Sequence, residues 1–140
     1  MIYTASFFES KYWGTGRLVN IAKSCPRDFP PEEIEDKVFY SEILYPSWNL
    51  LNDYKNNSIT EDKYKEIFLN ELSKKLNVTV EELYSGVLSS KILDLFGLCD
   101  EDTLLCWEPW KLKKFDKVIF CHRHIIAKIL TNNLLNVNNH

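Results

Sequence analysis

The residues best suited to chemistry lie in one tetrapeptide near the end of the chain, Cys121-His122-Arg123-His124. An ionised cysteine is a nucleophile, histidine moves protons near neutral pH, and arginine holds an anion through two parallel hydrogen bonds. If Cys121 precedes or caps a helix, the positive helix end and the neighbouring imidazoles and guanidinium favour its thiolate. The pattern predicts Cys121 as a catalytic nucleophile, His122 as its partner and Arg123 as a substrate ligand.

A second group of candidate residues, Cys106-Trp107-Glu108, follows the apolar run 103–105. Such a run is typical of a strand buried on both faces, and ligands of parallel sheets bind at the carboxyl ends of strands. Glu108 is therefore a candidate general acid or base, and Trp107 a candidate substrate-binding residue. Arg17, flanked by two glycines, is a further candidate anion ligand at a tight turn.

Several familiar sites are excluded by spacing. Phosphatase loops place the arginine several residues beyond the cysteine, whereas Arg123 follows Cys121 by two residues. The Walker pattern and the dinucleotide fingerprint are absent as well. Two alternatives stay open for the cysteines. Cys121 can be a small buried hydrophobic residue, or zinc or iron can be bound by the set Cys106, Cys121, His122 and His124, although no close Cys-x-x-Cys pair is present.

The hydrophobic pattern predicts elements that would position these residues. We expect strands over 2–8, 18–22 and 103–107, and helices over 48–55, 60–76 and about 122–130. A further helical region over 79–97 is broken near Gly86 and ended by Gly97. The tail 131–140 is expected to fray. Together these elements predict an α/β fold, one domain over residues 1–140 with a small, mostly parallel sheet flanked by helices.

Charge is unevenly distributed along the 140 residues. The net charge is +3 over 1–27, −11 over 28–108 and +5 over 109–140. If the two ends meet in space, they form a positive patch that attracts an anion, whereas the alternative is a solvated lysine surface. Interleaved aromatic residues also allow nucleic-acid binding, which the acidic pI of about 5.6 disfavours.

Targeting signals are not evident in the sequence. The first residues lack a basic segment followed by a long apolar one, and no apolar run approaches the length of a membrane span. The four cysteines are scattered, which favours free thiols over a disulfide framework. We expect a cytoplasmic protein that has no membrane contact. The sequence leaves the oligomeric state open.

The two cysteine segments also resemble a known family. The segment 104–109 (Leu-Leu-Cys-Trp-Glu-Pro) and, after a loop, 120–127 (Phe-Cys-His-Arg-His-Ile-Ile-Ala) are similar to the paired carboxy-terminal signature of the domain of unknown function (DUF) 488 family, in its compact branch. The segments 2–6, 16–22, 45–47 and 54–64 resemble it too. The resemblance implies an α/β domain and adds Tyr3 and Ser6, of the opening segment, to the candidate substrate-binding residues. It implies no particular reaction.

These observations lead to one functional hypothesis with two alternatives. We expect an enzyme that acts on an anionic substrate, nucleotide-like or phosphorylated, at a pocket of cysteine, arginine and glutamate, without a cofactor. The first alternative is a non-catalytic module that binds an anion, nucleic acid or protein. The second is a metal-binding protein with cysteine and histidine ligands.

Overall fold

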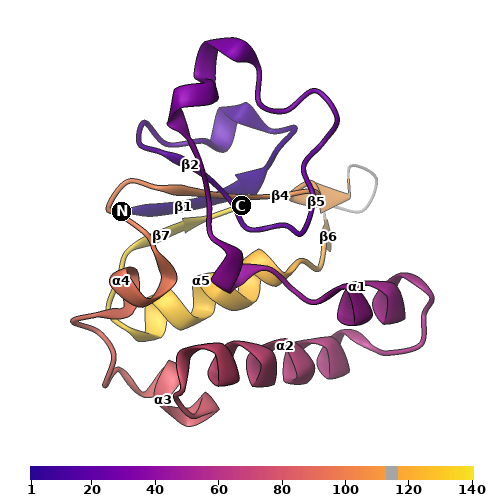
Figure 1. Ribbon diagram of the computed structural model, residues 1–140, viewed down its shortest axis with the longest axis vertical. Coiled ribbons are helices and arrows are strands. Elements are labelled where there is room, and N and C mark those ends of the chain that lie inside the picture. The colour runs from indigo at the N-terminus through magenta and orange to yellow at the C-terminus, as the bar shows by residue number, and fades with distance from the viewer. Residues whose placement is uncertain (113–116) are drawn as a thin grey trace.

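The computed structural model describes residues 1–112 and 117–140, and a parallel sheet lies at its centre (Figure 1). The strand order is β3-β2-β4-β1-β7, and every neighbouring pair is parallel. The strands are β1 (Ile2–Ser6), β2 (Leu18–Asn20), β3 (Val38–Tyr40), β4 (Thr103–Cys106) and β7 (Val137–Asn139). The α/β class and the parallel sheet predicted from the sequence are confirmed. The strands that pair come from segments that lie far apart in the sequence.

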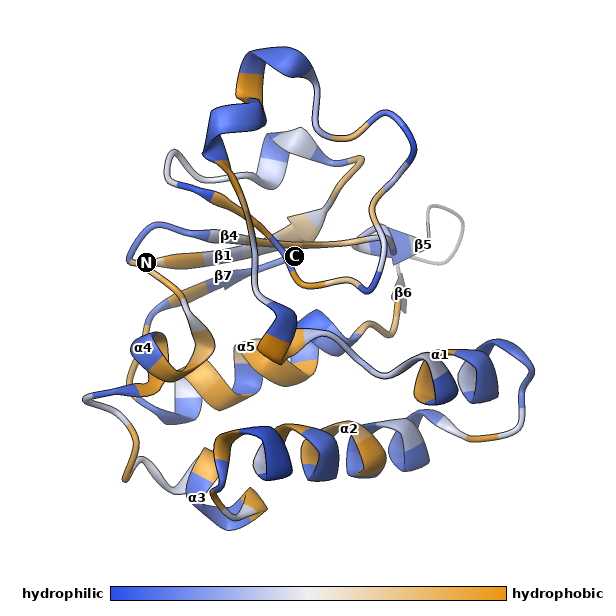
Figure 2. Ribbon diagram, in the orientation of Figure 1, coloured by the Kyte–Doolittle hydropathy of each residue, from blue (hydrophilic) through white to orange (hydrophobic). Residues whose placement is uncertain are grey.

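Helices cover one face of this sheet in two layers. In Figure 1, α5 (His122–Asn132) lies against the strands, and α2 (Glu61–Leu76) lies beyond it. β4 is mainly hydrophobic, whereas α5 and α2 each carry hydrophobic and hydrophilic residues (Figure 2). The core therefore lies between the sheet and α5, and a second apolar layer joins α5 to α2.

Shorter elements complete the fold. The remaining helices are α1 (Trp48–Lys55), α3 (Val80–Ser85), α4 (Ile92–Phe96) and the 3-10 helices η1 (Ser10–Tyr12), η2 (Glu32–Lys37) and η3 (Glu42–Leu44). A separate antiparallel pair consists of β5 (Lys111–Leu112) and β6 (Lys117–Val118). No helix among the described residues is both long and apolar enough to cross a bilayer.

Helix ends follow local capping chemistry. Ser47 Oγ accepts a hydrogen bond from the Leu50 amide at the start of α1, and Thr60 caps α2 in the same way. Thr79 and Glu82 form a complete capping box at α3. Gly86 and Gly97 end α3 and α4 in the left-handed conformation, with φ of 90° and 70°. The predicted breaks at both glycines are confirmed.

The expectation of a frayed tail over 131–140 is wrong. α5 continues to Asn132, and β7 then pairs with β1 in parallel register, with Ile2 opposite Val137. The His140 amide donates to the Thr4 carbonyl, and its ring stacks on Tyr12. The tail sequence is polar because β7 is a short edge strand, so its asparagines resemble those of an exposed tail.

Candidate functional site

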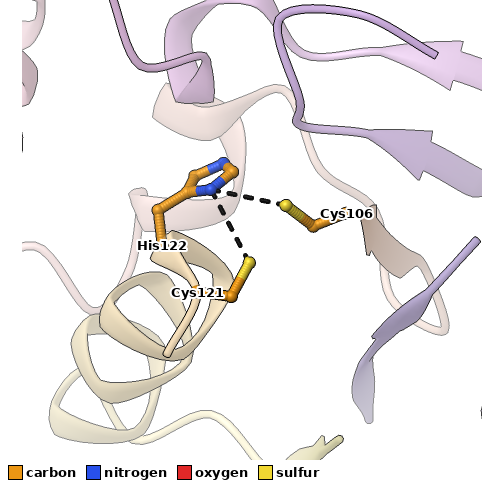
Figure 3. Close-up of side chains that lie close together, drawn as sticks. All are labelled: Cys106, Cys121 and His122. Carbon is orange, nitrogen blue, oxygen red and sulfur yellow. Dashed lines mark hydrogen bonds between the residues drawn. The ribbon is translucent and has the colours of Figure 1, made fainter. Parts of the chain in front are cut away.

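The carboxyl end of β4 and the start of α5 bring three reactive side chains together (Figure 3). Cys106 ends β4, Cys121 is the N-cap residue of α5, and His122 is the first residue of that helix. Both sulfurs face the same ring nitrogen: Cys106 Sγ lies 3.5 Å and Cys121 Sγ 3.8 Å from His122 Nδ1. All three side chains are at most 4% exposed.

The orientation of the His122 ring is set from the neighbouring strand. Its Nε2 lies 2.8 Å from the carbonyl oxygen of Ile21, which immediately follows β2. A carbonyl oxygen only accepts, so Nε2 carries the hydrogen and donates it. The edge of the Phe68 ring on α2 packs against the same imidazole. His122 therefore directs Nδ1 at the two sulfurs, where it can accept a proton or ligate a metal.

The two thiols have opposite electrostatic environments. Burial, the neighbouring Cys121 sulfur and Glu108 raise the pKa of Cys106 well above its usual value. Burial also opposes ionisation of Cys121, but its contacts with Cys106 and His122 and the nearby positive charge of Arg123 outweigh burial and lower its pKa well below the usual value. The two thiols therefore titrate as a coupled pair, in which Cys121 ionises more readily than Cys106.

Glu108 stands beside this pair. The Cys106 thiol donates to Glu108 Oε2 at 3.4 Å. Burial, followed by the negative charge of Cys121, raises the pKa of the Glu108 carboxyl. A carboxyl that holds its proton closer to neutral pH is suited to general acid–base work, which is the role predicted for Glu108.

A pocket of about 440 Å³ opens above the cysteines, and its lining is largely apolar and aromatic. Trp48 and Trp107 are 52% and 38% exposed and form part of its wall, and Lys23 and Lys55 belong to the same lining. The Trp107 indole donates to the Ser24 carbonyl, which fixes this ring. The other aromatic lining residues are Tyr54, Tyr64 and Phe120.

Arg123 and His124 point away from the pocket. The Arg123 side chain is fully buried and donates through Nη2 to the His140 carbonyl oxygen at 2.7 Å. His124 donates from Nδ1 to Asn139 Oδ1 at 2.9 Å. Consecutive helical residues are about 100° apart, so His122 faces the pocket while its two followers face β7. The substrate-binding role expected of Arg123 is not supported by this placement, and the predicted four-ligand metal set is reduced to three.

Arg17 and Tyr3 lie at the opposite end of the sheet from Cys106. Arg17 pairs with the buried carboxylate of Asp102, and Tyr3 contacts Glu101. A side chain at Gly14 would collide with the Tyr3 ring, and one at Gly16 with the Glu101 backbone. Gly14 and Gly16 thus permit close packing within the chain. Arg17 does not line the pocket.

Ser6 lies at the correct edge but is buried beneath the pocket. It is paired in register with Cys106, and its hydroxyl donates to the Trp107 carbonyl while accepting from the Phe8 amide. Ser6 is fully buried and is not among the lining residues. Its contacts support the turn that presents Trp107 and Glu108.

Most of the residues that line the pocket were not predicted from the sequence. Tyr64 belongs to the buried core, as its helical spacing predicts, and it also lines the pocket, as do Tyr54 and Lys55. The sequence contained one indication of their role. All three residues lie in the segment 54–64, which resembles the DUF 488 family although no strand is predicted there.

The aromatic residues interleaved with the basic ends, which allowed the nucleic-acid alternative, are Tyr12, Trp13, Trp107, Trp110 and Phe115. Tyr12 and Trp110 pack on His140, the Trp13 indole donates to the Ser6 carbonyl, Trp107 lines the pocket, and Phe115 lies outside the described residues.

Comparisons with protein-family models, with curated proteins and with solved structures find no match to this chain. The resemblance to the DUF 488 family therefore stays a prediction from sequence motifs. The candidate site is defined by the geometry of Cys106, Cys121, His122 and Glu108 at the base of an aromatic pocket.

Proposed function

We propose that this protein is an enzyme that binds an anionic, nucleotide-like substrate in the aromatic pocket and transforms it above Cys121 and Glu108. The observation that carries the proposal is the convergence of Cys106, Cys121, His122 and Glu108 at a pocket of about 440 Å³, where the pKa of Cys121 is lowered and that of Glu108 is raised. Perturbed ionisable groups that converge in a ligand-sized pocket are typical of active sites.

The walls of the pocket favour a flat substrate that carries negative charge. Trp48, Trp107 and Tyr54 offer aromatic faces on which a planar heterocycle can stack. Lys23 and Lys55 supply positive charge in the same lining, and both are exposed, so a phosphate can reach them without desolvating a buried ion. These lysines take the anion-binding role that the sequence assigned to Arg17 and Arg123.

Proton transfer is the step best supported by the side chains present. Glu108 is half-buried at the pocket, next to the Cys106 thiol. Burial, followed by the proximity of Cys121, raises the pKa of Tyr64 far above its usual value, so its hydroxyl stays protonated and can donate to a bound ligand. We place the activity in the cytoplasm, because all four cysteines are free thiols, as in reducing compartments.

The test combines a binding screen with product detection. Purified protein is screened by thermal shift against nucleosides, nucleoside monophosphates and sugar phosphates, and each stabilising compound is incubated and analysed by mass spectrometry. Glu108→Gln is expected to lower turnover by about 100-fold or more while leaving the Kd of the ligand nearly unchanged. Glu81→Gln, on the exposed side of α3, is the matched control and keeps full turnover.

Two results would contradict the proposal. Turnover that is equal in Glu108→Gln and the unchanged protein removes Glu108 from the reaction. Tight binding without any product, unaffected by Cys121→Ser, identifies the protein as a non-catalytic binding module.

A further inference from the structure

We propose that Cys106, Cys121 and His122 bind a zinc ion at the base of the pocket. The inference deepens the proposed function and rests on it only for the identity of the substrate. In the described part of the chain, the two sulfurs and one ring nitrogen of these residues all lie within 4.8 Å of one another. They come from two rigid elements, the end of β4 and the first turn of α5.

The two sulfur-to-nitrogen spacings match tetrahedral coordination, and the two sulfurs lie within 4.8 Å of each other. With Zn–S of about 2.3 Å and Zn–N of about 2.0 Å, neighbouring ligands lie roughly 3.6 Å apart for sulfur and nitrogen and roughly 3.8 Å apart for two sulfurs. The observed separations from His122 Nδ1 are 3.5 Å to Cys106 Sγ and 3.8 Å to Cys121 Sγ. A zinc ion therefore fits between the three atoms with small side-chain adjustments.

The hydrogen bond on the far side of His122 is an independent indication. Ligating imidazoles characteristically donate their other N–H to a carbonyl or carboxylate, which fixes the tautomer and the ring plane. His122 Nε2 makes this bond to the Ile21 carbonyl at 2.8 Å. Its Nδ1 lone pair is thereby directed at the two sulfurs before any metal arrives.

The ligand types favour zinc over magnesium and calcium. Two thiolates and one imidazole suit zinc, whereas magnesium and calcium require oxygen ligands. Zinc would also compensate the negative charge of two sulfurs that are buried to at least 96%. Three protein ligands leave a fourth position, and this arrangement is typical of catalytic zinc.

The fourth position faces the pocket, where Glu108 lies beside it. Cys106, Cys121 and His122 all contribute to the pocket lining, so the open side of the cluster is reached from there. Glu108 Oε2 is 3.4 Å from Cys106 Sγ but lies outside the three-residue ligand group. This placement suits Glu108 to carry a proton to or from a zinc-bound water, and it does not make Glu108 a fourth zinc ligand.

The corresponding reaction class is hydrolysis. Glu108 takes a proton from the zinc-bound water, and the resulting hydroxide forms a bond to the electrophilic atom of the substrate. The bond to the leaving group then breaks, its electron pair stays with that group, and Glu108 returns the proton to it. Water is the sole co-reactant, and no electron is transferred. In this scheme Cys121 serves as a ligand, and its nucleophilic role is replaced.

Metal analysis of the full chain tests the assignment. Protein purified without chelator is expected to contain one zinc per chain by elemental analysis, and its cobalt-substituted form should show thiolate-to-cobalt charge transfer. Cys106→Ser, Cys121→Ser and His122→Ala should each weaken zinc binding by roughly 100-fold or more, since even outer partners of zinc ligands contribute about 10- to 100-fold. Cys99→Ser and His124→Gln are matched controls that retain zinc.

The outcomes separate this inference from the proposed function. Absence of both stoichiometric zinc and the cobalt charge-transfer band overturns the zinc site, even if nucleotides bind and react. Zinc that is lost in Cys121→Ser but retained in Glu108→Gln supports it, even if no substrate is found. The cobalt spectrum of the unchanged protein decides the question should a ligand variant fail to fold.

Discussion

At the scale of single residues, Arg17 and Arg123 bind partners within the protein, in contrast to the substrate-binding role predicted for them. Arg17 donates through Nε and Nη2 to Asp102, at 2.9 and 2.7 Å, and Asp102 is fully buried. The same carboxylate accepts from the Cys99 amide. Breaking a buried pair leaves an uncompensated charge, which costs more than the pair itself contributes.

Replacing Arg17 therefore tests its structural role. Arg17→Leu is expected to lower the free energy of unfolding by about 3 kcal/mol, measured by urea denaturation, because the Asp102 carboxylate loses its partner. Arg27→Leu, at an exposed position, should change it by no more than about 0.5 kcal/mol. Loss of ligand binding in folded Arg17→Leu would instead restore Arg17 as a substrate ligand.

At the scale of elements, the edge strand β7 closes the sheet over Arg123. The Arg123 guanidinium is fully buried, its Nη2 donates to the His140 carbonyl, and its Nε and Nη1 have no hydrogen-bond partner among the described residues. Thr4 and Asn139 link β1 to β7 through a side-chain hydrogen bond of 2.5 Å. The last residues thus shield a buried charge in addition to pairing with β1.

Removal of β7 is the corresponding prediction. Deletion of residues 137–140 should lower the free energy of unfolding by roughly 3 kcal/mol or more, because Arg123 loses its acceptor and β1 loses a neighbour. Adding Arg123→Leu to the deletion should recover part of that loss, as measured by thermal denaturation. Asn138→Ala, an exposed change within β7, is the control. An unchanged melting temperature after deletion would show that the tail frays.

At the scale of the whole molecule, the two ends of the chain meet, and Arg17 and Arg123 of the basic segments bind partners within the chain, whereas Lys113 and Lys114 lie outside the described residues. β1 and β7 pair, so the two ends lie side by side. Arg17 is engaged by Asp102 and Arg123 is buried, which leaves Lys23 of the first basic segment at the pocket. Lys55, from the acidic middle of the chain, joins it there.

The ionic-strength dependence of ligand binding tests this distribution of charge. Lys23→Glu and Lys55→Glu should each raise the Kd of a phosphorylated ligand by roughly fivefold at low salt, because an exposed charge contributes up to about 1 kcal/mol. The effect should shrink as salt screens the charges. Titration calorimetry at two salt concentrations measures it. Lys128→Glu, exposed on α5, and the unphosphorylated ligand are controls that should show no such change.

The sequence by itself determined the elements whose signals are local. The α1, α2 and α3 helices begin at capping residues that act on amides three positions away. The buried run of β4 and the start of α5 were likewise evident, so Cys106, Glu108, Cys121 and His122 could be grouped in advance. Capping and apolar periodicity depend on neighbours within a few residues, and these can be read directly from the chain.

Only the tertiary structure decided which side chains meet. His122 is oriented by Ile21, which is 101 residues away, and Arg17 is engaged by Asp102 at a separation of 85 residues. The edge strand β7 is defined by β1, and its polar sequence carries no strand signal of its own. These partners are chosen by packing between distant segments. The sequence therefore identifies the cysteines and arginines as candidates, but the tertiary structure decides which of them face the pocket.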